Sequence, residues 1–211
     1  NSIGTRIIRI DSNGVYNNYV SVANSSFCEL WDMAFDCRNK SVFGMGGSTY
    51  SNQNCGSIDT LGNFSAVNFT GVPSGVFPQG YSQDVISSVL DENRNLYALV
   101  ASGPTLSVDN HLYRLNSSYN GNVWNVPTGW SSMSESDNKP YVAAFASNGF
   151  NAIDVNDYYV FYYDGQNLAA YDKSTGAFVS AGVSMPGYSL KRQGGIASDH
   201  CNRVYIGGNN G

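Results

Sequence analysis

The chain has 211 residues, of which 42% are apolar and 13% are charged, and its formal net charge is −5. The length suits one all-β domain, and the apolar share is large enough to fill a core, which excludes wholesale disorder. The few Lys and Arg residues form no cluster, which argues against nucleic acid and an anionic membrane surface as partners. No apolar stretch of about 18 residues occurs, so no membrane insertion is predicted.

Asn, Ser and Gly take the place of charged residues, with 25, 28 and 23 copies. Uncharged polar residues in this proportion are frequent on secreted and cell-surface β proteins. The sequence also begins without an initiator Met, so we expect a mature piece or an excised fragment. The missing signal peptide is then no evidence for the cytoplasm.

One local pattern recurs along the chain. A short apolar strand leads into an Asp-led polar turn, an aromatic-rich strand returns, and a Gly ends the unit. A unit that recurs at intervals of tens of residues cannot bury its own apolar faces and must stack on its neighbours. The copies span residues 33–47, 87–103, 152–165 and 195–208.

A second pattern follows the first, with two to four apolar positions, an Asp or Asn, and then a turn with Gly. It spans residues 6–14, 56–63, 111–121 and 167–176. Each pattern is typical of one hairpin, so a complete unit has four antiparallel strands, which is the blade of a β-propeller. The sequence therefore predicts an all-β, β-propeller fold, with no helix longer than two turns.

The predicted organisation is a single β-propeller domain over 1–211, with repeat units at about 33–63, 87–121, 152–176 and 195–211 plus 6–14. The chain begins with a second hairpin and finishes with a first hairpin. Two interpretations stay open. Either the ends meet and close a four-bladed ring, or the chain is a slice of a larger propeller.

Acidic residues lie at matching places in the repeat, which indicates a structural role in the turns. Asp supports a turn by accepting hydrogen bonds from backbone NH groups two residues further on. The structural turn residues predicted in this way are Asp36, Asp91, Asp154 and Asp199. We predict no catalytic residue, no metal site and no cofactor, because the two His and four Cys lack metal-ligand spacing and no nucleophile–base arrangement is evident.

Two sets of side chains leave alternatives open. Cys28 and Cys55 lie just outside the open end of the same predicted hairpin, which suits either a disulfide or buried thiols. Trp124, Trp130 and Tyr119 lie in a loop-rich region. Such aromatic rings stack on sugars, but they also cover the edges of cores, so glycan contact is one interpretation of two.

Three segments carry a resemblance: FCELWDMAFDCRNKSVFGMGG, FNAIDVNDYYVFYYDGQNLAAYDKSTGAFV and GGIASDHCNRVYIGGNNG, at residues 27–47, 150–179 and 194–211. They resemble the β-propeller-like part of gliding-motility-associated cell-surface proteins of gliding bacteria, which are exported by the type IX secretion pathway. The resemblance implies a secreted or bacterial cell-surface location and structural or adhesive work. It also implies, as partners, other domains of the same surface protein or the secretion and surface machinery.

Proteins of these bacteria often carry O-glycans on Asp followed by Ser or Thr and a small or apolar residue. Asp59-Thr60-Leu61 fits that pattern, so the resemblance makes Thr60 a candidate O-glycosylation site. The resulting hypothesis is a non-enzymatic surface module with a structural or adhesive role, part of a larger protein. The alternatives are a glycan-binding, lectin-like propeller and a propeller-type polysaccharide hydrolase or lyase.

Overall fold

The computed structural model describes residues 5–22, 29–47, 55–71, 83–102, 109–124, 153–163, 167–184 and 195–207. Within these residues all sixteen elements are β-strands, in agreement with the predicted all-β class. None of the described segments is a helix that could cross a membrane. The strands form five antiparallel sheets of two or four strands each.

Three sheets have four strands. The first contains β3 (Glu29–Asp36), β4 (Ser41–Gly47), β5 (Gly56–Ile58) and β6 (Phe64–Ala66). The second contains β7 (Gln83–Leu90), β8 (Leu96–Ser102), β9 (Asp109–Leu115) and β10 (Gly121–Trp124). The third contains β11 (Ile153–Val155), β12 (Tyr159–Tyr163), β13 (Asn167–Asp172) and β14 (Phe178–Ser184).

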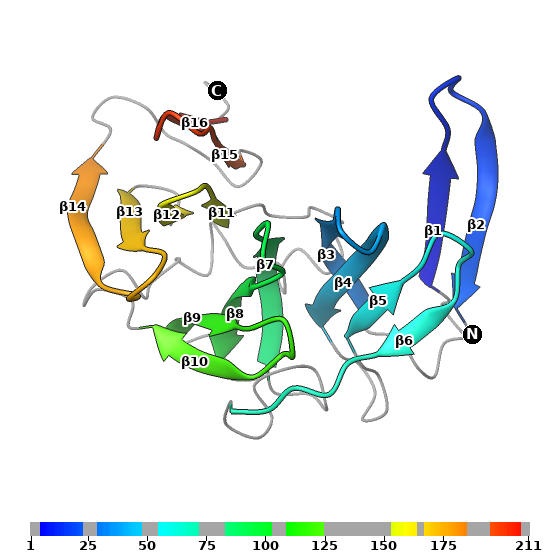
Figure 1. Cartoon of the computed structure of the whole chain (residues 1–211), viewed down its shortest axis with the longest axis horizontal. Coiled ribbons are helices and arrows are strands. Elements are labelled where there is room, and N and C mark those ends of the chain that lie inside the picture. The colour runs from blue at the N-terminus through cyan, green and yellow to red at the C-terminus, as the bar shows by residue number, and fades with distance from the viewer. Residues whose placement is uncertain are drawn as a thin grey trace.

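Two further sheets are single hairpins. One pairs β1 (Thr5–Ile10) with β2 (Tyr16–Val22), and the other pairs β15 (Ile196–Ser198) with β16 (Val204–Ile206). The two hairpins do not pair with each other, and the described strands form neither a closed barrel nor a closed ring (Figure 1). The structure therefore does not have the closed four-bladed arrangement that was one of the two interpretations.

Each four-stranded sheet is hydrogen-bonded in chain order, as expected for two successive hairpins. We call the hairpin of the first two strands the first hairpin, and the hairpin of the last two strands the second hairpin. The sheets cover residues 29–66, 83–124 and 153–184, so the first two extend beyond the predicted units at both ends and the third only at its C-terminal end. The turns of both hairpins lie at the same end of the strands, and therefore on one side of the sheet.

The sheets stand side by side with their first strands in a row. β3 lies against β7, β7 against β11, and β11 against β15. Figure 1 shows these first strands toward the middle of the molecule, and β6, β10 and β14 at its periphery. A row of sheets packed face to face is what the repeat predicts, because no sheet covers both of its own faces.

Three apolar clusters fill the spaces between successive sheets. Phe43 and Leu96 meet between the first and second sheets, Tyr97 and Tyr162 between the second and third, and Phe161 and Ile196 between the third sheet and β15–β16. Strand β12 supplies side chains to both of its faces, which explains why YVFYY shows no alternation of apolar and polar residues.

The chain also crosses between sheets at their outer strands. After β6 it continues to the β9–β10 turn, where the Thr70 NH donates to the Tyr119 carbonyl and the Gly121 NH donates to the Thr70 carbonyl. Gly71 follows with a φ of 69°, and a Cβ there would lie 2.1 Å from the Asn120 Oδ1 atom. Only glycine fits this crossing without strain.

Candidate functional site

Five turns have the same hydrogen bonds around an Asp or Asn. The side-chain Oδ1 accepts the NH groups two and four residues further on, and the main-chain carbonyl accepts the NH three residues further on. The third residue after it has a left-handed φ between 59° and 88°. The capping residues are Asp11, Asp59, Asp91, Asn116 and Asp199.

Two further turns are one residue longer and use a carboxylate in the same way. Asp36 accepts the NH groups of Arg38 and Asn39. Asp172 accepts the NH and the hydroxyl of both Ser174 and Thr175. These charge-assisted hydrogen bonds stabilise the ionised carboxylate, and the two hydroxyls lead in lowering the pKa of Asp172 to about 2.

The predicted turn-capping role is wrong for Asp154. In the β11–β12 turn the side chain of Asn156 accepts the NH groups of Tyr158 and Tyr159, and so takes the place that Asp36, Asp91 and Asp199 have in their turns. Asp154 lies within strand β11 instead. Its carboxylate accepts hydrogen bonds from the backbone NH of Ser198 and, at 2.8 Å, from the Ser198 hydroxyl.

That contact belongs to a series of hydrogen bonds in which a side chain on one first strand accepts a backbone NH from the first strand of the next sheet. We call these hydrogen bonds ties. Asp32 on β3 accepts the backbone NH of Ser88 on β7. Ser87 on β7 accepts the NH of Ile153 on β11 through its Oγ atom at 3.4 Å. With the Asp154–Ser198 contact, each sheet-to-sheet junction has one such tie. A side chain thereby satisfies a buried backbone NH between two first strands that do not pair.

Two β-bulges place the first two ties. The β3–β4 register shifts between Leu30 and Asp32, and the β7–β8 register shifts between Val85 and Ser87. Asp32 and Ser87 thus follow an extra residue at the same place, four residues before the turn-capping Asp36 and Asp91. A bulge re-aims the next side chain, which explains why these two polar groups reach the next sheet. Burial raises the pKa of Asp32, although the NH groups of Ser88 and Met33 stabilise its charged form.

A second set of polar contacts joins neighbouring turns. The Arg94 Nε atom lies 2.8 Å from the Asp36 Oδ2 atom, and the Asp36 side chain is only 5% exposed. Burial alone would raise the pKa of Asp36, but the Asn39 NH and the Arg94 guanidinium lower it. At the last junction the Asn156 side chain donates to the Asp199 carbonyl and to the Asn202 side chain.

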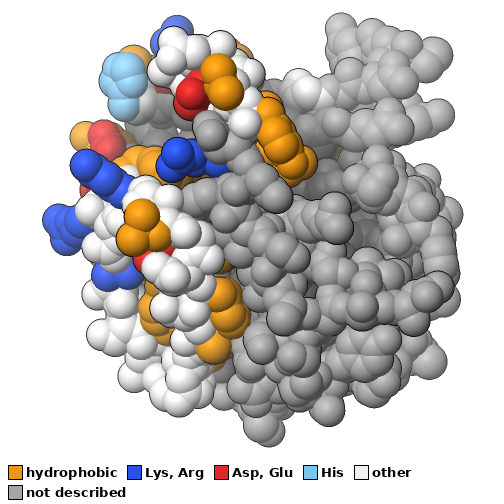
Figure 2. All heavy atoms as spheres, turned by 90° about the vertical axis from the view of Figure 1, so that its right-hand side faces the viewer, with side chains coloured by type: hydrophobic (Ala, Val, Ile, Leu, Met, Phe, Trp, Pro, Cys, Tyr) orange, Lys and Arg blue, Asp and Glu red, His pale blue; other side chains and the backbone are white. Residues whose placement is uncertain are grey.

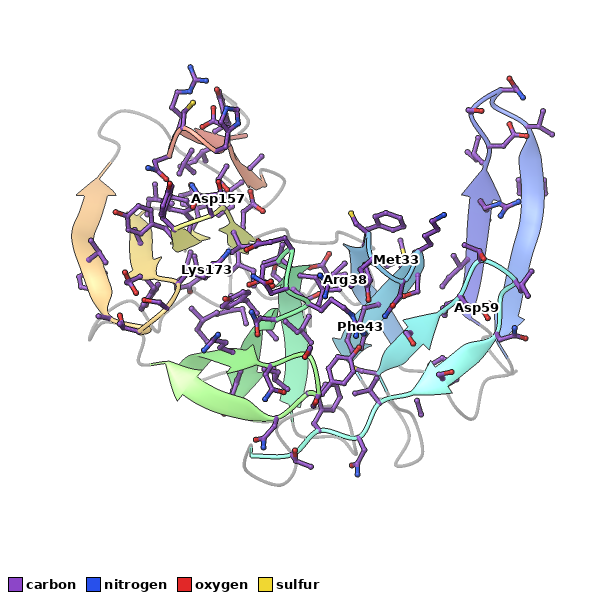
Figure 3. All side chains as sticks on the ribbon, viewed as in Figure 1. Met33, Arg38, Phe43, Asp59, Asp157 and Lys173 are labelled. Carbon is purple, nitrogen blue, oxygen red and sulfur yellow. The ribbon has the colours of Figure 1, made fainter. Side chains whose placement is uncertain are left out.

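Asp91 has the most buried carboxylate of these turns, with no exposed side-chain surface. It accepts hydrogen bonds from the Asn95 amide and, at 3.3 Å, from the Tyr97 hydroxyl. Lys173, from the β13–β14 turn of the next sheet, lies 3.8 Å from Asp91 and 2.9 Å from Glu92. Figure 3 shows Lys173 between the two sheets, where its ammonium group also donates to the Asn156 carbonyl.

These carboxylates are engaged in hydrogen bonds and ion pairs within and between the turns. Every turn carboxylate described above accepts backbone NH groups, and the two most buried ones, Asp36 and Asp91, also face a cation. Among the described residues no group of His, Cys, Asp and Glu has the arrangement of a metal site. Figure 2 shows basic side chains spread along one margin of the molecule with acidic ones between them, and no continuous patch of one sign.

Of the three candidate glycan contacts, the structure describes the side chain of Tyr119 only. Tyr119 is half-buried and stacks on Phe43 with ring centroids 5.3 Å apart, and Phe69 meets both rings edge-on, so Tyr119 covers the core between two sheets. These contacts match the interpretation that Tyr119 covers the edge of a core, and its sugar contact stays a prediction. Trp124 ends β10 opposite Leu112, but its side chain and all of Trp130 lie outside the described residues.

The remaining predicted sites are placed only in part. Cys55 is buried, but Cys28 lies outside the described residues, so the pairing of these two cysteines stays a prediction. Thr60 is exposed in the β5–β6 turn beside Leu61, which is 83% exposed. The structure thus puts the candidate O-glycosylation site where a sugar would project into solvent.

Sequence reasoning missed the ties between the first strands. Asp32, Ser87 and Ser88 were read only as parts of strands, because a side chain that reaches another sheet leaves no local pattern. One signal was available, since Asp32 and Ser87 both stand four residues before a turn-capping Asp. Comparison of the chain with protein-family models and with curated proteins found no match.

Proposed function

We propose that this chain is an arc of β-propeller blades that works as a non-enzymatic structural or adhesive module of a larger secreted or cell-surface protein. One observation carries the proposal: each of the three described junctions, from the first four-stranded sheet to β15–β16, combines an apolar cluster with a polar tie between first strands. Four-stranded antiparallel sheets in chain order, with their first strands side by side, support the assignment of blades.

A rigid row suits a spacer or a display platform. Because each tie satisfies a buried backbone NH, sliding one sheet on the next would leave that NH without a partner, which costs about 1–3 kcal/mol. The capped turns add stiffness at one edge of the row, where Arg94, Lys173 and Asn156 connect neighbouring turns. Loops on such a scaffold keep their relative positions, which is what adhesion through several weak contacts requires.

One observation favours this role over catalysis. Polysaccharide hydrolysis needs two carboxylates set across the sugar, one of them free to protonate the leaving group. The buried carboxylates of Asp36 and Asp91 instead accept several hydrogen bonds each within their own turns. The secreted or surface location rests on the composition and on the resemblance to gliding-motility-associated surface proteins.

Antibody labelling of the source cells tests the location. Antibodies raised against the 211-residue chain are expected to label intact cells as strongly as permeabilised ones. Labelling only after permeabilisation would overturn the surface assignment. As an internal control, an antibody to a cytoplasmic protein of the same cells must label only the permeabilised sample.

Incubation of the chain with a polysaccharide panel, combined with a glycan array, tests the non-enzymatic assignment. We expect no turnover and no glycan binding that depends on Trp124 or Trp130. Turnover lost in a single carboxylate variant would replace the proposal by a hydrolase or lyase. Specific glycan binding lost in Trp124→Ala or Trp130→Ala would replace it by a lectin.

A further inference from the structure

The first four-stranded sheet has one apolar face that its counterparts bury. Met33 and Phe35 stand three residues and one residue before the turn-capping Asp36, and they are 54% and 61% exposed. In Figure 3 Met33 lies on the side of its sheet that faces β1 and β2. At the same places in the third sheet, Ile153 and Val155 pack into the cluster shared with the preceding sheet.

The matching position in the second sheet behaves in the same way, since Leu90 packs into the cluster that it shares with Phe43. In β15, Ile196 packs against Phe161 of the preceding sheet. The Met33–Phe35 face therefore corresponds to the surface that packs on the preceding sheet in the later sheets. Met33 and Phe35 stand two residues apart on one strand, so their exposed side chains lie on the same face of the sheet.

The last hairpin, β15–β16, exposes the complementary surface, which packs on the following sheet in the earlier sheets. An aromatic residue of each second strand faces the next sheet: Phe43 stands opposite Ala34, and Tyr97 stands opposite Val89. Both rings are fully buried. Tyr205 stands in the same way opposite Ala197 on β15–β16, but it is 55% exposed.

The β15–β16 hairpin repeats the local network of β7–β8, which confirms that the two positions match. The Tyr205 hydroxyl donates to the Asp199 carboxylate six residues earlier, as the Tyr97 hydroxyl donates to Asp91. The Asp91 network is covered by Lys173 of the following sheet, whereas the Asp199 network is exposed. Among the described residues, the third sheet packs on β7–β8, whereas no described sheet packs on the corresponding side of β15–β16.

We propose that these two surfaces meet between copies of the chain, so that the Tyr205 face of β15–β16 in one copy packs on the Met33–Phe35 face of the next. The two faces lie at opposite ends of the row of sheets within one chain (Figure 1). Such a head-to-tail contact is heterologous, so it produces a closed ring or a filament and not a symmetric dimer. The inference needs the matching junctions and does not need the proposed surface role.

Two features of the hairpins at the ends favour this occupant over an unrelated protein. The capped turn of β1–β2, around Asp11, matches the second-hairpin turn around Asp59. Hairpin β15–β16 supplies a first hairpin, so β16 of one copy beside β1 of the next would complete a sheet in the order that β3–β4–β5–β6 already shows. The contact therefore continues an interface type that the chain uses three times.

The first-hairpin turns at the two faces would also come together, and each carries an exposed cysteine. Within the chain, neighbouring first-hairpin turns touch through Arg94 and Asp36. Docking would bring Cys201 of one copy close to Cys37 of the next, and both are exposed thiols.

Sedimentation velocity over a range of concentrations tests the proposal on the complete 211-residue chain. We expect concentration-dependent association, and we expect Met33→Glu and Ala197→Glu each to abolish it. Val179→Ser, which alters a 54% exposed apolar side chain on the outer strand β14 of the third sheet, is the matched control and must leave association unchanged. Circular dichroism checks that each variant keeps its strands.

Mixing distinguishes a head-to-tail contact from a symmetric one. Met33→Glu leaves the Tyr205 face intact and Ala197→Glu leaves the Met33–Phe35 face intact, so a mixture of the two variants is expected to form dimers and nothing larger. A monomeric wild-type chain at all concentrations would overturn the proposal. So would association that both variants retain.

Thiol cross-linking locates the contact. A short bismaleimide is expected to join Cys201 to Cys37 of another copy and to give a ladder of dimers and larger species in denaturing electrophoresis. Cys37→Ser and Cys201→Ser must each remove the ladder. A cross-link between these two cysteines within single chains would show that the faces close on each other inside one molecule, and would overturn the assignment to a second copy.

Discussion

The turns around Asp91 and Asp59 have the same local hydrogen bonds and opposite surroundings. In both, the Oδ1 atom accepts two backbone NH groups and the Oδ2 atom accepts the amide of an Asn four residues further on. The Asp91 carboxylate is fully buried and faces Lys173, whereas the Asp59 turn carries an exposed Thr60. A local pattern therefore fixes the shape of a turn, while its neighbours decide what the turn contributes to stability.

The largest effect is expected from removing the buried carboxylate. Asp91→Ala removes the acceptor of the Asn95 amide and of the Tyr97 hydroxyl, and a carboxylate 3.8 Å from the Lys173 ammonium, which keeps Glu92 as its partner. Hydrogen bonds to a charged group contribute about 1.5–3 kcal/mol each, so we expect a loss of about 3–5 kcal/mol. Asp59→Ala removes the same local hydrogen bonds in an exposed turn, so it is the matched control. Denaturant unfolding of both variants measures the difference, and equal losses would show that the local bonds carry the whole effect.

The Asp32–Ser88 tie between β3 and β7 extends the comparison to a buried carboxylate for which no ion pair is described. Asp32→Asn keeps an oxygen acceptor for the Ser88 NH and removes a charge whose burial raises its pKa. Asp32→Ala leaves that NH without an acceptor, which costs about 1–3 kcal/mol. We therefore expect Asp32→Ala to lower the free energy of unfolding clearly more than Asp32→Asn does. The reverse order would mean that the charge itself stabilises the junction.

Much of the local structure was predictable, because turns and strands leave patterns within a few residues. The strands, the two hairpins per sheet and the capping roles of Asp36, Asp91 and Asp199 belong to this class. Asp154 was misassigned because DVND offers three turn-forming residues within four positions. The sequence gives no reason to prefer Asn156 until the pairing of Val155 with Val160 is known.

Contacts between sheets were not predictable in the same way. Tyr119 lies in a polar turn, and only the position of Phe43 in another sheet explains its stacking. The Asp32–Ser88 tie joins residues 56 positions apart. Such contacts depend on how two sheets are placed, and a single sequence holds no local record of that placement.

A smaller effect is expected at the Arg94–Asp36 contact, which is partly accessible to water. The Arg94 side chain is 25% exposed, so solvent screens the pair and we expect a coupling energy of about 1 kcal/mol. The measurement is a double-mutant cycle with Asp36→Asn, Arg94→Gln and both together. Arg94 has a φ of 65°, which all three chains share, so the cycle cancels its backbone strain. A coupling energy near zero would show that the contact does not link the two sheets.

The smallest effect concerns the exposed turns and acidic pH. The pKa of Asp172 and that of Asp199 are about 2, below the value near 3.9 of an unfolded Asp. Both carboxylates therefore favour the folded state above about pH 4, and this contribution is lost as the pH falls toward 2. Asp32 has the opposite sign, because a raised pKa favours folding as the proton binds.

We accordingly expect the melting temperature to fall between pH 4 and pH 2, and to fall less steeply in Asp172→Asn, which keeps an oxygen acceptor for the NH groups of Ser174 and Thr175 but no longer titrates. Asp32→Asn should instead act above pH 4, where it removes the stability that wild-type Asp32 gains as the pH falls because the folded chain binds this proton first. Thermal melts of the three chains at half-unit pH intervals measure both slopes. If Asp172→Asn and Asp32→Asn changed the slope in the same direction, the assignment of opposite signs to the exposed turn and the buried tie would be wrong.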